Sequence, residues 1–171
     1  MTREEITNNI CIVDNSLITC TLIYRLLEER LPNAVIQYYL DPADLLLKEL
    51  TCCDLMIIDE ALINHSGTEV LGHLYDYILE SEIDYSLADN FPQVLFSTSI
   101  STKSILKRLK QEKILDVVNY QIIKKPFHPG ELETKVEQML DVEPCPKSFL
   151  YTSNIPSSIM SFTTGFKSIF H

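Results

Sequence analysis

The chain has 171 residues, 46% of them hydrophobic and 22% charged, which is the composition of a globular domain with a full core. Acidic residues outnumber lysine and arginine by 24 to 14, and the resulting net charge of −10 argues against a nucleic-acid partner. No apolar run approaches the roughly 20 residues that a membrane span needs, so we expect no membrane span.

Short apolar segments alternate with longer, helix-like segments along the chain. The expected strands, rich in β-branched or aromatic residues, are residues 10–13, 34–40, 54–58, 93–96 and 119–123. The expected helices, with apolar residues at three- and four-residue steps, are residues 16–31, 42–50, 68–82, 102–114 and 130–140. Pro42 and Pro129 stand where two of these helices begin, a position at which the missing amide hydrogen costs nothing.

This alternation predicts an α/β fold, a doubly wound parallel sheet of five strands, (βα)5, with helices on both faces. The near-continuous apolar strands agree, because parallel strands are buried on both sides. We place this domain at residues 1–141. Residues 142–171 contain several prolines and many Ser and Thr residues, and we expect an irregular tail that is disordered or serves as a docking segment.

Two acids directly follow expected strands. Asp14 follows the first strand and Asp59 the third, and sites in doubly wound sheets gather at the carboxyl ends of strands. If the two strands are neighbours, the carboxylates share one crevice, where their mutual repulsion favours a bound cation. Oxygen ligands with an open face suit Mg²⁺. The alternative is that each acid only caps the helix that follows it.

Two further polar side chains end the last two expected strands. Thr98, in VLFSTS, offers a hydroxyl at the end of the fourth strand. Lys125, in QIIKKPFHPG, is biased toward an extended backbone by Pro126. A lysine held in this way can reach across the crevice to a phosphoryl oxygen as a point charge. The simpler interpretation of both residues is a polar side chain that merely ends a strand.

Together these motifs resemble the receiver domain of two-component response regulators, the CheY-like fold, over roughly residues 8–140. The resemblance rests on CIVDNS, IIDEALINHSG, VLFSTS and KKPF, which occur in this order. It implies that Asp59 is the phosphoacceptor, that Thr98 contacts the phosphoryl group and that Lys125 pairs with it. It also implies a Mg²⁺ site with four oxygen ligands, from Asp14, Asn15, Asp59 and the backbone carbonyl of Ala61.

The resemblance further implies a stand-alone receiver. Such a protein takes a phosphoryl group from a histidine kinase or a phosphotransfer protein and then binds a downstream protein target. It is not an enzyme beyond this self-phosphorylation. Phosphorylation would bias the surface formed by the fourth helix, the fifth strand and the fifth helix between two arrangements.

Three departures from the family's pattern favour a competing function, a phosphorylation-independent pseudo-receiver that acts as a protein-interaction scaffold. Asn15 stands where a second acid is usual, which removes one negative charge from the metal site. The usual proline is missing after the acceptor, in EALIN. Ile122 stands where an aromatic residue usually reports phosphorylation, and we expect nearby Tyr120 to face away from it.

A haloacid-dehalogenase-like phosphatase would need an acid two residues after its nucleophile, which neither DNS nor DEA supplies.

The cysteines and the N-terminus indicate the cellular compartment in which we expect the protein. The five cysteines have no CxxC spacing, and we expect them to be reduced and mostly buried. The polar N-terminus, MTREEITNN, carries no apolar signal segment. With no membrane span expected, these features predict a cytoplasmic protein.

Overall fold

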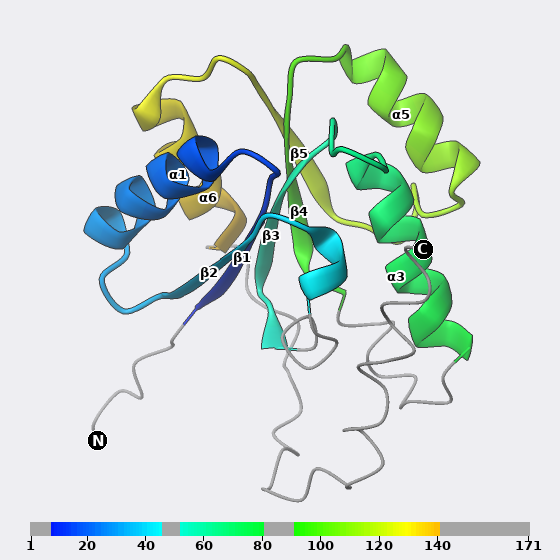
Figure 1. Cartoon of the computed structure of the whole chain (residues 1–171), viewed down its shortest axis with the longest axis horizontal. Helices are drawn as coiled ribbons and strands as arrows, with labels where there is room; N and C mark the ends of the chain where they lie inside the picture. Colours follow the sequence, from blue (N-terminus) through cyan, green and yellow to red (C-terminus); the bar gives the residue numbers. More distant parts are fainter. Residues whose placement is uncertain (1–7, 46–51, 81–90, 141–171) are drawn as a thin grey trace, which may run out of the picture.

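The computed structural model of the protein describes residues 8–45, 52–80 and 91–140, in which strands and helices alternate (Figure 1). The strands are β1 (Asn9–Val13), β2 (Val35–Tyr39), β3 (Leu55–Asp59), β4 (Gln93–Thr98) and β5 (Tyr120–Lys124). The helices are α1 (Leu17–Arg30), α3 (Gly67–Glu80), α5 (Thr102–Gln111) and α6 (Pro129–Leu140), with a short 3-10 helix, η1 (Pro42–Asp44). The predicted tail, residues 142–171, lies outside the described residues.

The described strands form one parallel sheet in the order β2-β1-β3-β4-β5. Helices α1 and α6 cover one face of the sheet, and α3 and α5 cover the other (Figure 1). We call these the α1/α6 face and the α3/α5 face. The predicted doubly wound, five-stranded α/β sheet is therefore confirmed.

Successive residues of each strand alternate between the two faces, as the pleat of a strand requires. On the α1/α6 face, Ile57 and Leu95 pack in one cluster with side chains of α1 and α6. On the α3/α5 face, Ile58 and Phe96 pack in a second cluster with side chains of α3 and α5. Each fully buried side chain of this size stabilises the fold by about 1.5–3 kcal/mol. All residues of β3 are buried, so the carboxylate that ends this strand is held at the centre of the sheet.

The helix predicted over residues 42–50 is wrong in its described part. Pro42–Asp44 form only a 3-10 turn, capped by Asp41, whose Oδ1 accepts a hydrogen bond from the Ala43 amide at 2.9 Å. The next residue, Leu45, has an extended backbone with φ −67° and ψ 118°. Its side chain is fully buried in the cluster of the α3/α5 face, and this burial outweighs the helical periodicity of the segment. Residues 46–51 lie outside the described residues.

The expectation that Tyr120 faces away from Ile122 is also wrong. Both side chains are partly buried against the cluster of the α3/α5 face. Two residues separated by one position on a strand share a face, which is the physical reason. The Tyr120 ring meets the Phe96 ring edge-on, with centroids 6.2 Å apart. An aromatic side chain therefore does lie beside Ile122 on this face.

Within the described residues no cysteine forms a disulfide, and three of them, Cys11, Cys20 and Cys53, are buried, as expected. Cys52 is exposed. Among the described residues, no helix combines the length and the apolar character that crossing a membrane requires.

Candidate functional site

Two buried carboxylates lie side by side at the carboxyl edge of the sheet. Strands β1 and β3 are neighbours, and their register pairs Val13 with Ile58, so that Asp14 and Asp59 follow at the same level. Asp14 is 2% exposed and Asp59 8%. Two ionised carboxylates this deeply buried require a compensating positive charge.

Lys125 supplies that charge. Its Nζ lies 2.7 Å from Asp14 Oδ2 and 2.9 Å from Asp59 Oδ2. The lysine follows β5 directly, and its amide donates to the Thr98 carbonyl at 2.9 Å, which fixes the backbone from which the side chain reaches across. Burial alone would lower the pKa of Lys125, but hydrogen bonds to both carboxylates and their charges outweigh it, and the pKa is raised. The ammonium is therefore charged at neutral pH.

The second oxygen of each carboxylate is held by the backbone. Asp14 Oδ1 accepts a hydrogen bond from the Ser16 amide at 2.8 Å, and Asp59 Oδ1 accepts one from the Ala61 amide at 3.1 Å. The N-cap of α1 is Ser16, whose Oγ accepts from the Thr19 amide. Asp14 therefore does not merely cap the helix, because its other oxygen binds Lys125.

The start of α3 is packed tightly against the end of strand β3. A Cβ added at Gly67 would lie 2.6 Å from the Asp59 carbonyl oxygen, closer than real contacts allow. The Gly67 amide also donates to the Glu60 carbonyl at 3.2 Å. Glycine is thus required at this position, because any side chain would push α3 away from the end of β3.

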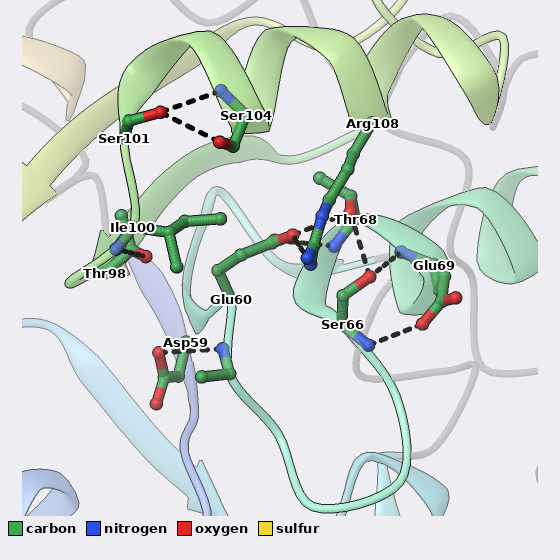
Figure 2. A network of polar contacts seen from close by, with 11 residues as sticks. Asp59, Glu60, Ser66, Thr68, Glu69, Thr98, Ile100, Ser101, Ser104 and Arg108 are labelled. Carbon is green, nitrogen blue, oxygen red and sulfur yellow. Dashed lines mark hydrogen bonds and ion pairs between the residues drawn. The ribbon is translucent and has the colours of Figure 1, made fainter.

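Thr98 lies beside the site, and its hydroxyl oxygen accepts a hydrogen bond from the backbone. The residue is fully buried, and its Oγ1 accepts a hydrogen bond from the Ile100 amide at 3.0 Å (Figure 2). The structure describes no hydrogen bond between this hydroxyl and Asp59 or Lys125. Thr98 follows the parity of Phe96 along β4, so its side chain starts from the α3/α5 face.

Asn15 and Ala61 lie on the exposed rim of the site. Both residues are exposed, and Asn15 lines a cavity of about 300 Å³ together with residues 40–43 and 62–65. Ala61 contacts Asp59 through its amide. The structure thus brings the carboxylates of Asp14 and Asp59 into contact with Lys125, whereas Asn15 and Ala61 are exposed next to them in the chain.

The oxygen atoms around Asp59 fit a magnesium ion in kind. Within the described residues no three His, Cys, Asp or Glu side chains are grouped as metal ligands. A cation here would therefore bind the two carboxylates of Asp14 and Asp59 and complete its shell with amide, carbonyl or water oxygens. Mg²⁺ prefers such a site, since it binds one or two carboxylates and keeps several waters.

Glu60, the residue after Asp59, forms a polar network that the sequence analysis missed. Its Oε1 accepts from Arg108 Nη1 at 2.8 Å and from the Thr68 hydroxyl at 2.9 Å, and its Oε2 accepts from the Thr68 amide at 3.0 Å. The Glu60 carboxylate points toward α3 and α5, whereas the Asp59 carboxylate points the other way (Figure 2). Burial raises the pKa of Glu60, although the bonds from Thr68 and Arg108 oppose the shift. No local sequence motif indicates the pairing of Glu60 with Arg108, because Arg108 lies 48 residues further along the chain.

Comparisons with known proteins agree on the fold. No family model matches the sequence, and no curated protein matches it significantly. Many solved structures match the fold. Among them are the chemotaxis protein CheY4 of Vibrio cholerae (18% identity over 79% of this chain and all of that chain, TM-score 0.60) and the BeF3-activated receiver domain of DrrB (17% identity, 79% and 98%, TM-score 0.57). A CheY-like response-regulator receiver domain protein from Methanospirillum hungatei JF-1 matches at 18% identity over 80% of this chain and 95% of its own, with a TM-score of 0.57. The chain therefore has the fold of CheY-like receiver domains, and at these identities the likeness establishes the fold alone.

Proposed function

We propose that the protein is a response-regulator receiver domain in the cytoplasm that accepts a phosphoryl group on Asp59. The donor would be a histidine kinase or a phosphotransfer protein, and the phosphorylated form would bind a downstream protein target. Apart from this self-phosphorylation the protein would have no enzymatic activity.

One observation carries the proposal: the Lys125 ammonium bridges two buried carboxylates at the carboxyl edge of a receiver-like sheet. A purely structural ion pair needs one acid for one base. Here one cation serves two acids, so the cluster retains a net negative charge that a second cation can neutralise. The arrangement suits a site that exchanges charged groups at Asp59.

The chemical step follows from these contacts. A carboxylate oxygen of Asp59 attacks the phosphorus of a phosphohistidine, so that an O–P bond forms while the P–N bond breaks. The imidazole leaves and takes up a proton from water. Lys125 can bind the phosphoryl oxygens and neutralise their negative charge, because its Nζ already lies beside Asp59. Mg²⁺, when bound, would neutralise further charge on the phosphoryl group.

A phosphorylation-independent scaffold is the competing function. Asn15 in place of a second acid favours it. The scaffold makes no use of the Asp59 carboxylate as a nucleophile. The two functions therefore differ in one measurable event, the formation of an aspartyl phosphate.

Intact mass after incubation with phosphoramidate and Mg²⁺ tests the proposal. We expect the wild type to gain one phosphoryl group and Asp59→Asn to gain none. Asp116→Asn is the matched control, since this exposed aspartate lies outside the site and its variant should be phosphorylated like the wild type. A wild type that gains no phosphoryl group from phosphoramidate or from acetyl phosphate would overturn the proposal in favour of the scaffold.

A further inference from the structure

Ser97, on strand β4, carries a buried hydroxyl outside the network of Asp14, Asp59 and Lys125. The residue is 1% exposed, and within the described part of the chain its Oγ has no hydrogen-bond partner. Buried polar groups are almost always paired, and an unpaired one calls for an explanation such as a bound group that the fold alone does not contain. The preceding β4 residues from Val94 to Phe96 are apolar and buried, so the strand itself has no need of a polar group here.

The register of the sheet places this hydroxyl next to the proposed phosphoacceptor. Strands β3 and β4 are neighbours, and Ser97 pairs with Asp59 at the same level. Adjacent strands lie about 4.7–4.9 Å apart, so the two side chains start as direct neighbours. On the next strand, Ser97 pairs with Ile123, two residues before Lys125.

Strand alternation places Ser97 and Asp59 on the same face. Leu95 and Ile57, each two residues earlier on its strand, both pack in the cluster of the α1/α6 face. Ile123 packs there too, so Lys125 starts from the same face. Thr98 has the opposite parity and therefore starts from the α3/α5 face, where its hydroxyl oxygen accepts from the Ile100 amide. The β4 hydroxyl that shares both level and face with the acceptor carboxylate is therefore that of Ser97.

We propose that Ser97 is a positioning residue of the acceptor site, which donates its hydroxyl hydrogen to an oxygen of the phosphorylated Asp59 side chain. This inference rests on the proposed function. The phosphorylated aspartate carries added negative charge and additional acceptor oxygens beside a donor whose hydrogen is uncommitted. In the unphosphorylated protein, Lys125 and the Ala61 amide already bind the Asp59 carboxylate. The Ser97 hydroxyl therefore stays available to bond the phosphorylated side chain.

A packing role makes the opposite prediction for the same substitution. If Ser97 is present only because a small side chain fits, Ser97→Ala leaves phosphorylation unchanged. If the hydroxyl serves the phosphorylated state, Ser97→Ala slows phosphorylation even though it does not destabilise the fold. An unpaired buried hydroxyl costs stability, so its removal is neutral or stabilising. Activity and stability should thus change in different directions.

The experiment measures the phosphorylation rate constant with phosphoramidate at saturating Mg²⁺, the Mg²⁺ affinity and the urea midpoint. We expect Ser97→Ala to slow phosphorylation by about tenfold or more, the lower end of the effect of one hydrogen bond to a charged group, with unchanged Mg²⁺ affinity and an equal or higher urea midpoint. Ser97→Thr, which keeps the hydroxyl, should stay within about threefold of the wild type. The control Ser104→Ala removes a hydroxyl on α5, outside the site, and should react like the wild type.

The outcomes separate this inference from the proposed function. If the wild type is phosphorylated and Ser97→Ala reacts within about twofold of it, the positioning role is overturned and the receiver function stands. If Ser97→Ala weakens Mg²⁺ binding by the same factor as the rate, the hydroxyl acts on the cation and the proposal is again wrong. If the wild type gains no phosphoryl group, the proposed function fails and the role of Ser97 fails with it.

Discussion

Asp59 and Glu60 are neighbours in the chain, both are buried and both lie beside a basic side chain, yet their surroundings differ. Asp59 lies on the α1/α6 face and shares Lys125 with a second carboxylate. Glu60 points to the α3/α5 face and accepts three hydrogen bonds, two from Thr68 and one from Arg108. The Asp59 carboxylate belongs to a cluster of two acids and one lysine, which keeps a surplus negative charge. The Glu60 carboxylate has one cation of its own, and both of its oxygens accept hydrogen bonds.

This difference shows how one strand end can serve both chemistry and structure. Alternation of side chains directs consecutive acids into separate layers, so that neither competes for the partners of the other. Glu60 joins the start of α3 to α5 through Thr68 and Arg108, one residue after Asp59. Glu60 thereby holds α3 and α5 against the end of β3, while the Asp59 carboxylate binds Lys125 and the Ala61 amide.

The largest expected effect comes from Lys125→Met, which leaves Asp14 and Asp59 buried without a cation. We expect the phosphorylation rate to fall ~100-fold, because the charge that stabilises the transferring group is lost. The free energy of unfolding should fall by about 2 kcal/mol, below the usual cost of breaking a fully buried pair, because water reaches part of the Lys125 side chain. Phosphoramidate kinetics by intact mass and urea denaturation measure the two quantities.

Lys124→Met is the matched control for this prediction. Lys124 is exposed and precedes Lys125 in the chain, so its replacement should leave both quantities near the wild-type values. Added Mg²⁺ should stabilise Lys125→Met more than the wild type, since the ion takes over part of the neutralisation. Equal phosphorylation of Lys125→Met and the wild type would show that the two acids do not depend on this lysine.

The contrast between the two acids also marks how far sequence analysis reached. Hydrophobic periodicity was sufficient for the order of elements and for the sheet, and strand ends identified Asp14, Asp59 and Lys125 as neighbours. Hydrophobic periodicity failed at Leu45, because burial of this side chain in the core ends the helix that the periodicity predicts. It also missed Ser97, because a single serine at a strand end is unremarkable until the register places it opposite Asp59.

Arg108→Met tests the structural half of the comparison and should have a smaller effect. The variant leaves the buried Glu60 carboxylate with Thr68 as its remaining partner, but 44% of the Arg108 side chain is exposed, so water screens the pair. We expect a loss of about 1 kcal/mol in the free energy of unfolding, measured by urea denaturation. The phosphorylation rate should stay near that of the wild type, because Asp59 keeps Lys125.

Lys107→Met, on the same helix, removes an exposed cation for which the structure describes no ion pair, and it should change neither quantity. If Arg108→Met slowed phosphorylation as strongly as Lys125→Met, the two carboxylates would act as one unit, and the separation of faces would be wrong.

The smallest expected effect is a pH dependence that belongs to Glu60 alone. Burial raises the pKa of Glu60 above its ordinary value of 4.5, so the folded state binds this proton more tightly than the unfolded state does. The stability that Glu60 contributes is therefore fully present below its unfolded pKa and is lost as the pH rises through its folded pKa. Glu60→Gln cannot titrate, so the free energy of unfolding of the wild type minus that of the variant should decrease as the pH rises above the ordinary pKa of 4.5. Urea denaturation at pH steps above this value measures the difference, and the exposed Glu29→Gln serves as a control that should follow the wild type closely. A difference that instead grew with pH would mean that Arg108 and Thr68 outweigh the burial of the carboxylate, and Glu60 would then be a net electrostatic anchor of α3 and α5.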